Sequence, residues 1–190
     1  MRISEAKEQV RPLLTKDRYD HSLRVAETAV VLAERYGVPA DKAELAAVWH
    51  DHAKYRPKEE LKHFIANSSL PQDLLEYHHE LWHGPVGALL LEDEYGLKDR
   101  DIQNAVHYHT TGRANMTKME MVIFLADYIE PGRAFPGVQE VREAAGTDLV
   151  RACWMAAKNT IHFLTNKQAL VYPDTFHAYN DLTRKLTGGL

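Results

Sequence analysis

The sequence predicts an all-α protein in which helices pack around a single core. Apolar residues recur at the three- and four-residue spacing of amphipathic helices, and capping residues, glycines and prolines punctuate these stretches at helical lengths. No stretch alternates apolar and polar residues as a half-buried strand does. With 190 residues, of which 45% are hydrophobic and 26% charged, the chain is long enough for one sizeable core. We therefore expect one domain over residues 1–190.

The first two long helices have recognisable ends. In DRYDHSLRVAETAVVLAERYG we expect Asp17 to be the N-cap and Gly37 the C-terminal stop. Between them an apolar stripe follows helical spacing, through Tyr19, Leu23, Ala26, Val30 and Ala33. The next stretch, VPADKAELAAVWHDHAKY, begins with Pro39 in a first-turn position and is predicted to run as helix through His50 and Asp51.

Helices are also predicted for the rest of the chain. They are expected to begin near Pro57, Pro71 and Pro85, the last of these ending at Gly96, and another is expected from Asp99 to His107. The run MVIFLA in TKMEMVIFLADYIEPG is compatible with a buried strand. However, Thr117 and Glu120 form a capping-box pattern and Pro131-Gly132 ends the segment at helical length, so we predict a helix. TDLVRACWMAAKNTIHFL and DTFHAYNDLTRKL are predicted as the final two helices.

Composition excludes several classes of protein. The net charge is −4, so no global attraction to nucleic acid or to an anionic membrane is expected, although a local cationic site could bind phosphate. The single cysteine, Cys153, rules out an intramolecular disulfide and suits a reducing cytosol. The N-terminus lacks the apolar core of a signal peptide, and no segment reaches the roughly 18 apolar residues of a membrane span. We expect a soluble cytoplasmic protein.

The stretch AAVWHDHAKY places His50 and Asp51 side by side on a largely apolar segment, in a chain with eleven histidines. For this pair alone, the simpler interpretation is favoured: Asp51 pairs with Lys54 at i+3, and His50 is a hydrogen-bonded core histidine. The alternative is a metal site.

Asp127 strengthens the metal interpretation. It follows the apolar run MVIFLA, and no cation lies three or four residues away from it on the same helix. An isolated buried carboxylate costs several kcal/mol unless it is paired, protonated or bound to a cation. A metal explains it economically; a distant arginine or exposure to solvent remains an alternative.

Three further histidines are candidates for the same site. His21 points partly inward on a second ridge of its helix with Val25 and Leu32, His83 precedes Gly84-Pro85 at a helix start, and His109 follows a helix end. Each is weak by itself, because a lone inward histidine is more often a core residue than a ligand. Helix ends are nevertheless good places from which to aim side chains at one point.

The order His21, His50-Asp51, His83, His109 and Asp127 resembles the HD-domain metal-dependent phosphohydrolases, whose signature is H…HD…D on an all-α core. The resemblance extends over nearly the whole chain to the YqeK-type branch of that family. It rests on six stretches in this order: RYDHSLRV, AAVWHDHAKY, HGPVGA, AVHYHTTG, ADYIEPGR and FPGV.

The resemblance implies an HD-domain helical bundle with short additional terminal helices. Its metal core would cover about residues 17–133, with C-terminal helices over residues 147–190 packed on it. It also implies a binuclear metal centre, most often iron, with manganese or another metal as the alternative. His21, His50, Asp51 and Asp127 match the HD signature, His83 and His109 match the histidines that complete the second metal, and Asp51 would bridge the two ions. The remaining seven histidines match no ligand position and are interpreted as surface or core residues: His52, His63, His78, His79, His107, His162 and His177.

Nucleotide contacts are predicted around this centre. Lys54 would bind phosphate, as the family implies, or pair with Asp51; Arg133 would bind phosphate or be a surface arginine. The hydroxyls of Thr110 and Thr111 suit phosphate oxygens, although an ordinary polar turn is the alternative. His109 and Tyr128 complete the predicted contacts near the metals.

The tail ALVYPDTFHAYNDL contributes three aromatic residues, Tyr172, Phe176 and Tyr179. They stack a purine or pack the last helix on the core, and packing is favoured for at least two of them. Tyr172 and Phe176 are the predicted purine contacts. Family members often have Ala-Arg-Asn where this chain has Ala178-Tyr179-Asn180, so any ligand contact of that arginine would be changed here.

The resemblance implies a symmetrical dinucleoside tetraphosphate hydrolase that cuts diadenosine tetraphosphate into two ADP by a metal-bound hydroxide. Asp51, Lys54 and Arg133 would be the catalytic residues, and neither nucleic acid nor membrane is an expected partner. Two alternatives stay open: another HD phosphohydrolase acting on a mononucleotide or cyclic dinucleotide, and a non-enzymatic nucleotide sensor that holds metal and ADP. The complete ligand set argues against the sensor. A homodimer is a further expectation from the family.

Overall fold

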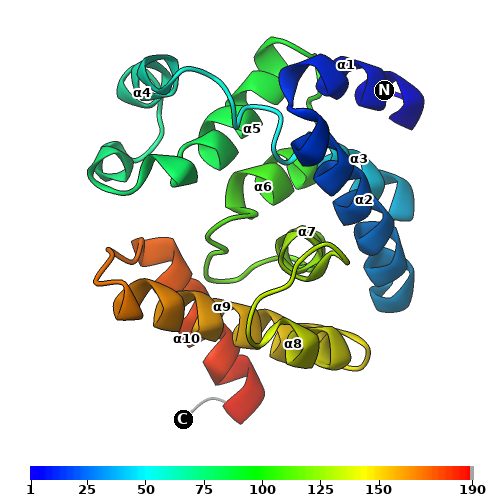
Figure 1. Ribbon diagram of the computed structural model, residues 1–190, viewed down its shortest axis with the longest axis vertical. Coiled ribbons are helices and arrows are strands. Elements are labelled where there is room, and N and C mark those ends of the chain that lie inside the picture. Colours follow the sequence, from blue (N-terminus) through cyan, green and yellow to red (C-terminus); the bar gives the residue numbers. More distant parts are fainter. Residues whose placement is uncertain (189–190) are drawn as a thin grey trace.

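The prediction of an all-α fold is confirmed. In the computed structural model, which describes residues 1–188, every regular element is a helix (Figure 1). The α-helices are α1 (Ile3–Val10), α2 (Lys16–Tyr36), α3 (Ala40–Trp49), α4 (Lys58–Ala66), α5 (His83–Asp93), α6 (Arg100–Tyr108), α7 (Lys118–Ile129), α8 (Val138–Ala145), α9 (Leu149–Asn166) and α10 (Pro173–Thr187). Three short 3-10 helices connect them: η1 (Arg11–Leu13), η2 (Gln72–Glu76) and η3 (His79–Leu81).

Helix α2 begins earlier than predicted. Thr15 rather than Asp17 is the N-cap, because its hydroxyl accepts a hydrogen bond from the Arg18 amide; Asp17 lies in the first turn, where its charge favours the helix dipole. The C-terminal stop at Gly37 is confirmed, with a left-handed φ of 69° that glycine adopts without strain. The buried face of α2 also differs from the predicted stripe. It runs through the ridge that carries His21, together with Ser22, Val25, Ala26, Ala29, Leu32 and Ala33.

Helix α3 was expected to run through His50 and Asp51, but that prediction is wrong: the helix ends at Trp49. Pro39 is its N-cap rather than a first-turn residue. Past Trp49 the backbone turns tightly with i→i−3 bonds, and the His50 Nδ1–H donates to the Ala47 carbonyl at 2.6 Å. Side chains that take up the last carbonyls compete with continuation of the helix. His50 and Asp51 therefore lie at a helix end.

The other helix boundaries follow the predictions in part. The helix starts at Pro57 and Asp99 and the Thr117–Glu120 capping box are confirmed. Pro71 begins only the 3-10 helix η2, and Pro85 lies inside the first turn of α5, which starts at His83 and ends at Asp93. Helices α1 and α8, each eight residues long, are additional to the predicted helices.

The helices form one main core and a smaller one. Helices α2, α3, α6 and α7 pack together, α9 packs on α7 and α8, and α10 packs on α9. The smaller core lies under α4 and η2 and includes Leu61, Ile65 and Tyr172, so the segment before α10 reaches the region around α4 and α5. The candidate site lies where the ends of α3, α5 and α6 meet α2 and α7 (Figure 1). No helix in residues 1–188 has the length and apolar character needed to cross a membrane.

Candidate metal centre

Asp51 lies at the middle of a buried cluster of imidazoles, and none of its side-chain surface is exposed. Its two oxygens face different histidines. Oδ2 lies 2.9 Å from His50 Nε2 and 3.7 Å from His21 Nε2, whereas Oδ1 lies 3.0 Å from His83 Nε2 and 3.8 Å from His109 Nε2. A carboxylate whose oxygens face two separate donor groups has the arrangement needed to bridge two cations.

Asp127 closes the cluster on one side. Its Oδ1 lies 3.0 Å from His21 Nε2 and 3.9 Å from His50 Nε2. On the other side His83 Nε2 and His109 Nε2 are 3.1 Å apart. Two sets of three residues could each hold an ion, His21-His50-Asp127 and His50-Asp51-His109, and within each set the ligand atoms lie within 4.8 Å of one another. The structure thus brings all six predicted metal ligands together.

Hydrogen bonds orient these imidazoles so that Nε2 faces the cluster. The Nδ1 atoms of His50 and His109 lie 2.6 and 2.7 Å from the carbonyls of Ala47 and Val106, and His21 Nδ1 lies 3.0 Å from the Glu130 carboxylate. Metal-binding histidines typically use their second nitrogen in this way, which fixes the tautomer. His50 and His109, which follow the ends of α3 and α6, are thereby held in fixed orientations.

The polar atoms of the cluster suit a cation. His21 Nε2, His50 Nε2 and both oxygens of Asp51 are buried without a well-aligned hydrogen bond among the described residues, although the Asp51 oxygens lie against imidazoles and the Arg18 guanidinium. Burial acts to raise the pKa of Asp51, but His50 and His83 hold it well below its usual value; burial acts to lower the pKa of His50, but the Asp51 charge raises it overall. The site favours positive charge, and its imidazole and carboxylate donors suit divalent transition metals. The residues present therefore fit the metal centre that the family implies.

Three charged residues that were not singled out from the sequence support the cluster. Glu130, which is 2% exposed, joins His21 to Arg24, whose Nε lies 2.6 Å from Glu130 Oε2. Burial acts to raise the pKa of Glu130, but Arg24, His21 and the Gly132 amide lower it to about 2. The Arg18 guanidinium lies against Asp51 Oδ2. The quoted stretches RYDHSLRV and ADYIEPGR contain all three residues, but only their partners across the fold reveal what they do.

Arg133 is the distant arginine that pairs with Asp127. Its Nη2 lies 2.5 Å from Asp127 Oδ1, and its Nε donates to the Asp127 carbonyl at 2.9 Å. Burial acts to raise the pKa of Asp127, but His21 and Arg133 hold it well below its usual value. Asp127 is 15% and Arg133 30% exposed, so this edge of the cluster opens to solvent.

Lys54 pairs with Glu80 instead of Asp51, with Nζ 2.6 Å from Glu80 Oε2. It lines a cavity of about 340 Å³ that also reaches His83, so a ligand in that cavity would contact both the lysine and the edge of the metal cluster. Arg56, Lys58 and the Glu80 carboxylate line the same cavity, so charges of both signs surround the Lys54 ammonium.

Three further predicted nucleotide contacts, Thr110, Thr111 and Tyr172, have polar or aromatic groups that are buried or already hydrogen-bonded within the protein. Thr110 Oγ1 is buried without a partner among the described residues, whereas the Thr111 hydroxyl donates to the Gly112 carbonyl at 2.9 Å. Tyr172 is buried edge-to-face against Tyr77, with ring centroids 4.9 Å apart.

Phe176 is 52% exposed and is the more available of the two predicted purine contacts. Tyr179 stacks on Trp154, which is the packing role favoured from the sequence.

None of the seven other histidines belongs to the metal cluster. Cys153 is buried in the core, where burial raises the pKa of its thiol.

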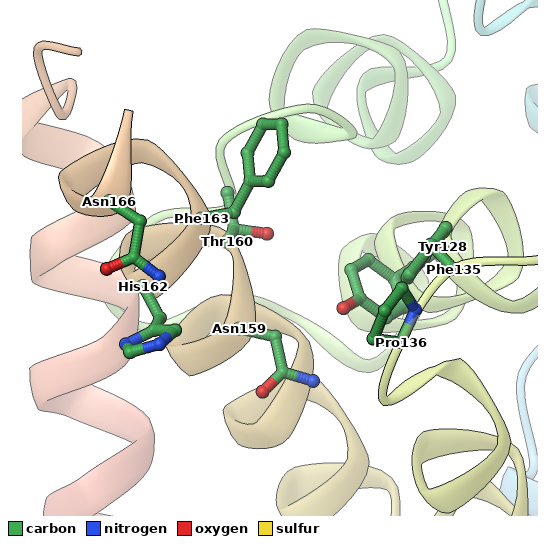
Figure 2. Close-up of a pocket in the computed structure, with 8 residues that line it drawn as sticks. All are labelled: Tyr128, Phe135, Pro136, Asn159, Thr160, His162, Phe163 and Asn166. Atoms are coloured by element: carbon green, nitrogen blue, oxygen red, sulfur yellow. The ribbon is translucent and has the colours of Figure 1, made fainter. Parts of the chain in front are cut away.

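A larger pocket of about 530 Å³ lies beside Asp127. Figure 2 shows Tyr128, Phe135 and Pro136 on one side of it and residues of α9 on the other. The α9 residues that line it are Asn159, Thr160, His162, Phe163 and Asn166. Tyr128 follows Asp127 directly in α7, so one helix contributes to both this pocket and the metal cluster.

Comparisons with known proteins place this geometry in context. The sequence model of the HD domain matches residues 18–132. The chain is 53% identical to a protein of Bacillus subtilis strain 168 named "Bis(5'-nucleosyl)-tetraphosphatase, symmetrical", over 95% of this chain and 97% of that protein. It is 48% identical to the protein of the same name from Halalkalibacterium halodurans, over 96% and 97% of the two chains.

A solved structure also matches. The crystal structure of a predicted HD superfamily hydrolase involved in NAD metabolism, from Clostridium acetobutylicum, superimposes with a TM-score of 0.91 at 38% sequence identity. The match covers 96% of this chain and 97% of that one.

Proposed function

This chain belongs to the HD domain family, and we propose that it hydrolyses dinucleoside tetraphosphates symmetrically. The observation that carries the proposal is the six-residue cluster around Asp51, in a chain that is 53% identical over 95% of its length to a symmetrical bis(5'-nucleosyl)-tetraphosphatase. The preferred substrate in this proposal is diadenosine tetraphosphate, and the products are two molecules of ADP.

Two metal ions would be held by the cluster, with iron as the first expectation and manganese as the alternative. The ligands are those predicted from the sequence: His21, His50, Asp51, His83, His109 and Asp127. The ions would lower the pKa of a bound water toward neutrality and so supply the nucleophile, and they would offset negative charge on the phosphates.

The protein side chains orient the substrate. Lys54 lies on the His83 side of the cluster, and Arg133 lies on the Asp127 side. A polyphosphate chain laid across the cluster would therefore meet a cation at each side. Both cations would offset the charge that builds up on the phosphate oxygens as the bond breaks. This two-sided arrangement supports a cut in the middle of the bridge.

The protonation state of the cluster supports the same reaction. Burial and the neighbouring His50 and His83 hold the pKa of His109 well below its usual value, so its imidazole is neutral at pH 7 and Nε2 is free to bind a metal. Asp51 and Asp127 are ionised for the reasons given above. Asp51, His109 and Asp127 are thus in the forms that bind a metal near neutral pH.

Product analysis tests the proposal. Metal-loaded protein incubated with diadenosine tetraphosphate in oxygen-18 water is expected to give ADP as the only nucleotide product. One ADP of each pair should carry a single label on its terminal phosphate. Equal amounts of ATP and AMP would contradict symmetric cleavage while leaving hydrolysis by the metal centre intact.

A substrate panel separates the alternatives that remain from the sequence. Turnover of mononucleotides or cyclic dinucleotides in preference to diadenosine tetraphosphate would indicate another HD phosphohydrolase. Tight binding of ADP without turnover of any member of the panel would indicate a nucleotide sensor. A dinucleoside tetraphosphate as the fastest substrate supports the proposal.

A further inference from the structure

The pocket beside Asp127 is distinct from the metal cluster in its chemistry. Its lining contains no lysine, arginine or carboxylate. Aromatic rings come from Tyr128, Phe135 and Phe163, and side-chain amides come from Asn159 and Asn166. Phe163 is 55% exposed although it is a large apolar side chain. A pocket of this kind suits a neutral planar ring with polar edges and offers no cation for a phosphate.

The pocket and the metal centre draw residues from the same two segments, helix α7 and residues 133–136. Asp127 and Tyr128 are successive residues of α7, and their side chains point about 100° apart around the helix. Arg133 binds Asp127, and two residues later Phe135 packs edge-to-face on Tyr128, with ring centroids 5.0 Å apart. The segment that carries Arg133 thus also contributes to the pocket, through Phe135 and Pro136.

The size of the pocket fits a nucleoside. Its volume of about 530 Å³ lies within the roughly 300–1,000 Å³ of small-ligand sites. Aromatic side chains stack on any nucleobase, and asparagine amides can both donate to and accept from a base edge. Burial raises the pKa of Tyr128, so its hydroxyl stays protonated as a neutral polar group in this wall.

We propose that this pocket binds one of the two purine bases of a dinucleoside polyphosphate, a proposal that rests on the function proposed above. Phe163 is the stacking surface and Asn159 contacts the base edge; Figure 2 shows both side chains in the pocket lining. Arg133 holds the phosphates of the same nucleotide. The substrate carries two bases, and the other is left to the separate region of Phe176.

The test uses a diadenosine tetraphosphate analogue with a methylene group in place of the central bridging oxygen, which symmetric hydrolysis cannot cut. Its Kd is measured by calorimetry on the metal-loaded protein. Because stacking of a base on an aromatic ring gives about a 5- to 150-fold gain in affinity, Phe163→Ala should raise the Kd by a factor in that range. Phe163→Tyr keeps the ring and should stay within about threefold of the unaltered protein.

A matched control is available at Val31, which is 56% exposed on α2, far along the chain from the pocket residues. Val31→Ala should leave the Kd unchanged. Phe163 is exposed to a similar degree, so its truncation is not expected to unfold the protein, and circular dichroism checks that point. An unchanged Kd in Phe163→Ala overturns the proposal. If the same variant changes only the oligomeric state, the pocket is instead an interface between copies of the chain.

Base selectivity provides a second readout that general damage to the fold would not move. Asn159→Leu should change the ratio of the Kd values for the adenine and guanine forms of the analogue. An equal change for both forms would remove Asn159 from base recognition. Hydrolysis of the natural substrate by the unaltered protein is measured separately, so failure of the proposed function and failure of the pocket proposal give different results.

Discussion

Asp51 is enclosed by four imidazoles, and its two oxygens face two different pairs of them. We expect Asp51→Ala and His50→Ala to lose at least one metal ion and nearly all turnover. His52→Asn is the matched control, since His52 is buried next to Asp51 in sequence but lies edge-on to Trp49, outside the cluster. Elemental analysis measures the metal content; full occupancy in both alanine variants would remove these residues from the ligand set.

Lys54 and Arg133 are expected to bind the substrate; Arg133 also pairs with the predicted metal ligand Asp127, whereas Lys54 pairs with Glu80. Lys54→Ala and Arg133→Ala should keep the metals but lose about 30- to 1000-fold in kcat, because each removes a charge-assisted contact of roughly 2–4 kcal/mol. Lys98→Ala, at an exposed position, is the control and should be neutral. Steady-state kinetics with diadenosine tetraphosphate provide the measurement. Unchanged kinetics in both variants would return the two residues to ordinary surface charges.

Glu130 positions His21 and does not itself reach the centre of the cluster. Replacing it by glutamine keeps the shape but removes the charge that Arg24 and His21 share. Loss of such a supporting partner typically weakens metal affinity by about 10- to 100-fold. Competition with a fluorescent chelator measures this affinity, with Glu34→Gln at an exposed site as control. Equal affinities for Glu130→Gln and the unaltered protein would show that His21 needs no such support.

At the scale of elements, helix ends position the metal ligands. His83 is the first residue of α5, His109 follows α6, and His50 follows α3. At a helix end the direction of a side chain is not set by the helical repeat, while the helix itself remains a rigid support. The close crossing of α5 and α6 is what brings His83 and His109 within 3.1 Å of each other.

Gly84 permits this crossing. A Cβ at Gly84 would lie 2.8 Å from the His107 carbonyl oxygen and 3.2 Å from the Val106 carbonyl oxygen, too close for either backbone to accommodate without moving. We expect Gly84→Ala to push α5 away from α6, to cost about 1–3 kcal/mol of stability and to weaken metal binding.

Gly87→Ala is the control for the Gly84 prediction on the same helix. An added Cβ there would meet the His52 ring, at 3.1 Å, and the Ala53 Cβ, at 3.5 Å, which are side-chain and not backbone atoms. Urea unfolding and metal titration of both variants make the comparison. A Gly84→Ala protein with unaltered stability and metal affinity would contradict the crossing argument.

At the scale of the whole molecule, a buried histidine outside the metal cluster makes stability depend on pH. Burial lowers the pKa of His52 to about 4, against about 6.5 in an unfolded chain. Between pH 6.5 and 4 the unfolded state therefore binds a proton at His52 that the folded state does not. The contribution of this group to the free energy of unfolding is present above pH 6.5 and is lost as the pH falls toward 4. At pH 5 the loss from this one group is about 2 kcal/mol.

Urea unfolding at pH 7.5 and pH 5 checks this sign. Metal-free protein is used, so that acid release of metal does not contribute, and His52→Asn, which can keep the bond to the Trp49 carbonyl, should lose less stability on acidification. His107, whose pKa burial also lowers to about 4, remains in both proteins and cancels in the comparison. The same pH dependence in both proteins would mean that His52 does not titrate in this window.

The sequence by itself determined the helical class, most helix positions and the residue types of the site. These follow from local physics: apolar spacing, capping boxes such as Thr117–Glu120, and a buried aspartate that has no partner on its own helix. The predicted symmetrical hydrolase and its HD family came from the order of motifs along the chain, and the comparisons agree with them. The predicted metal core of about residues 17–133, the homodimer and the base preference stay predictions.

Only the tertiary structure decided how the predicted ligands meet and which charges support them. Arg133 neutralises Asp127 from six residues away, beyond the reach of helical spacing, and Glu130 joins Arg24 to His21 across more than a hundred residues. The end of α3 at Trp49 also depends on a side-chain bond that spacing rules do not describe. The physical reason is common to all three. Periodicity reports which face of an element is buried, but the partner of a buried charge is chosen by the way separate elements pack.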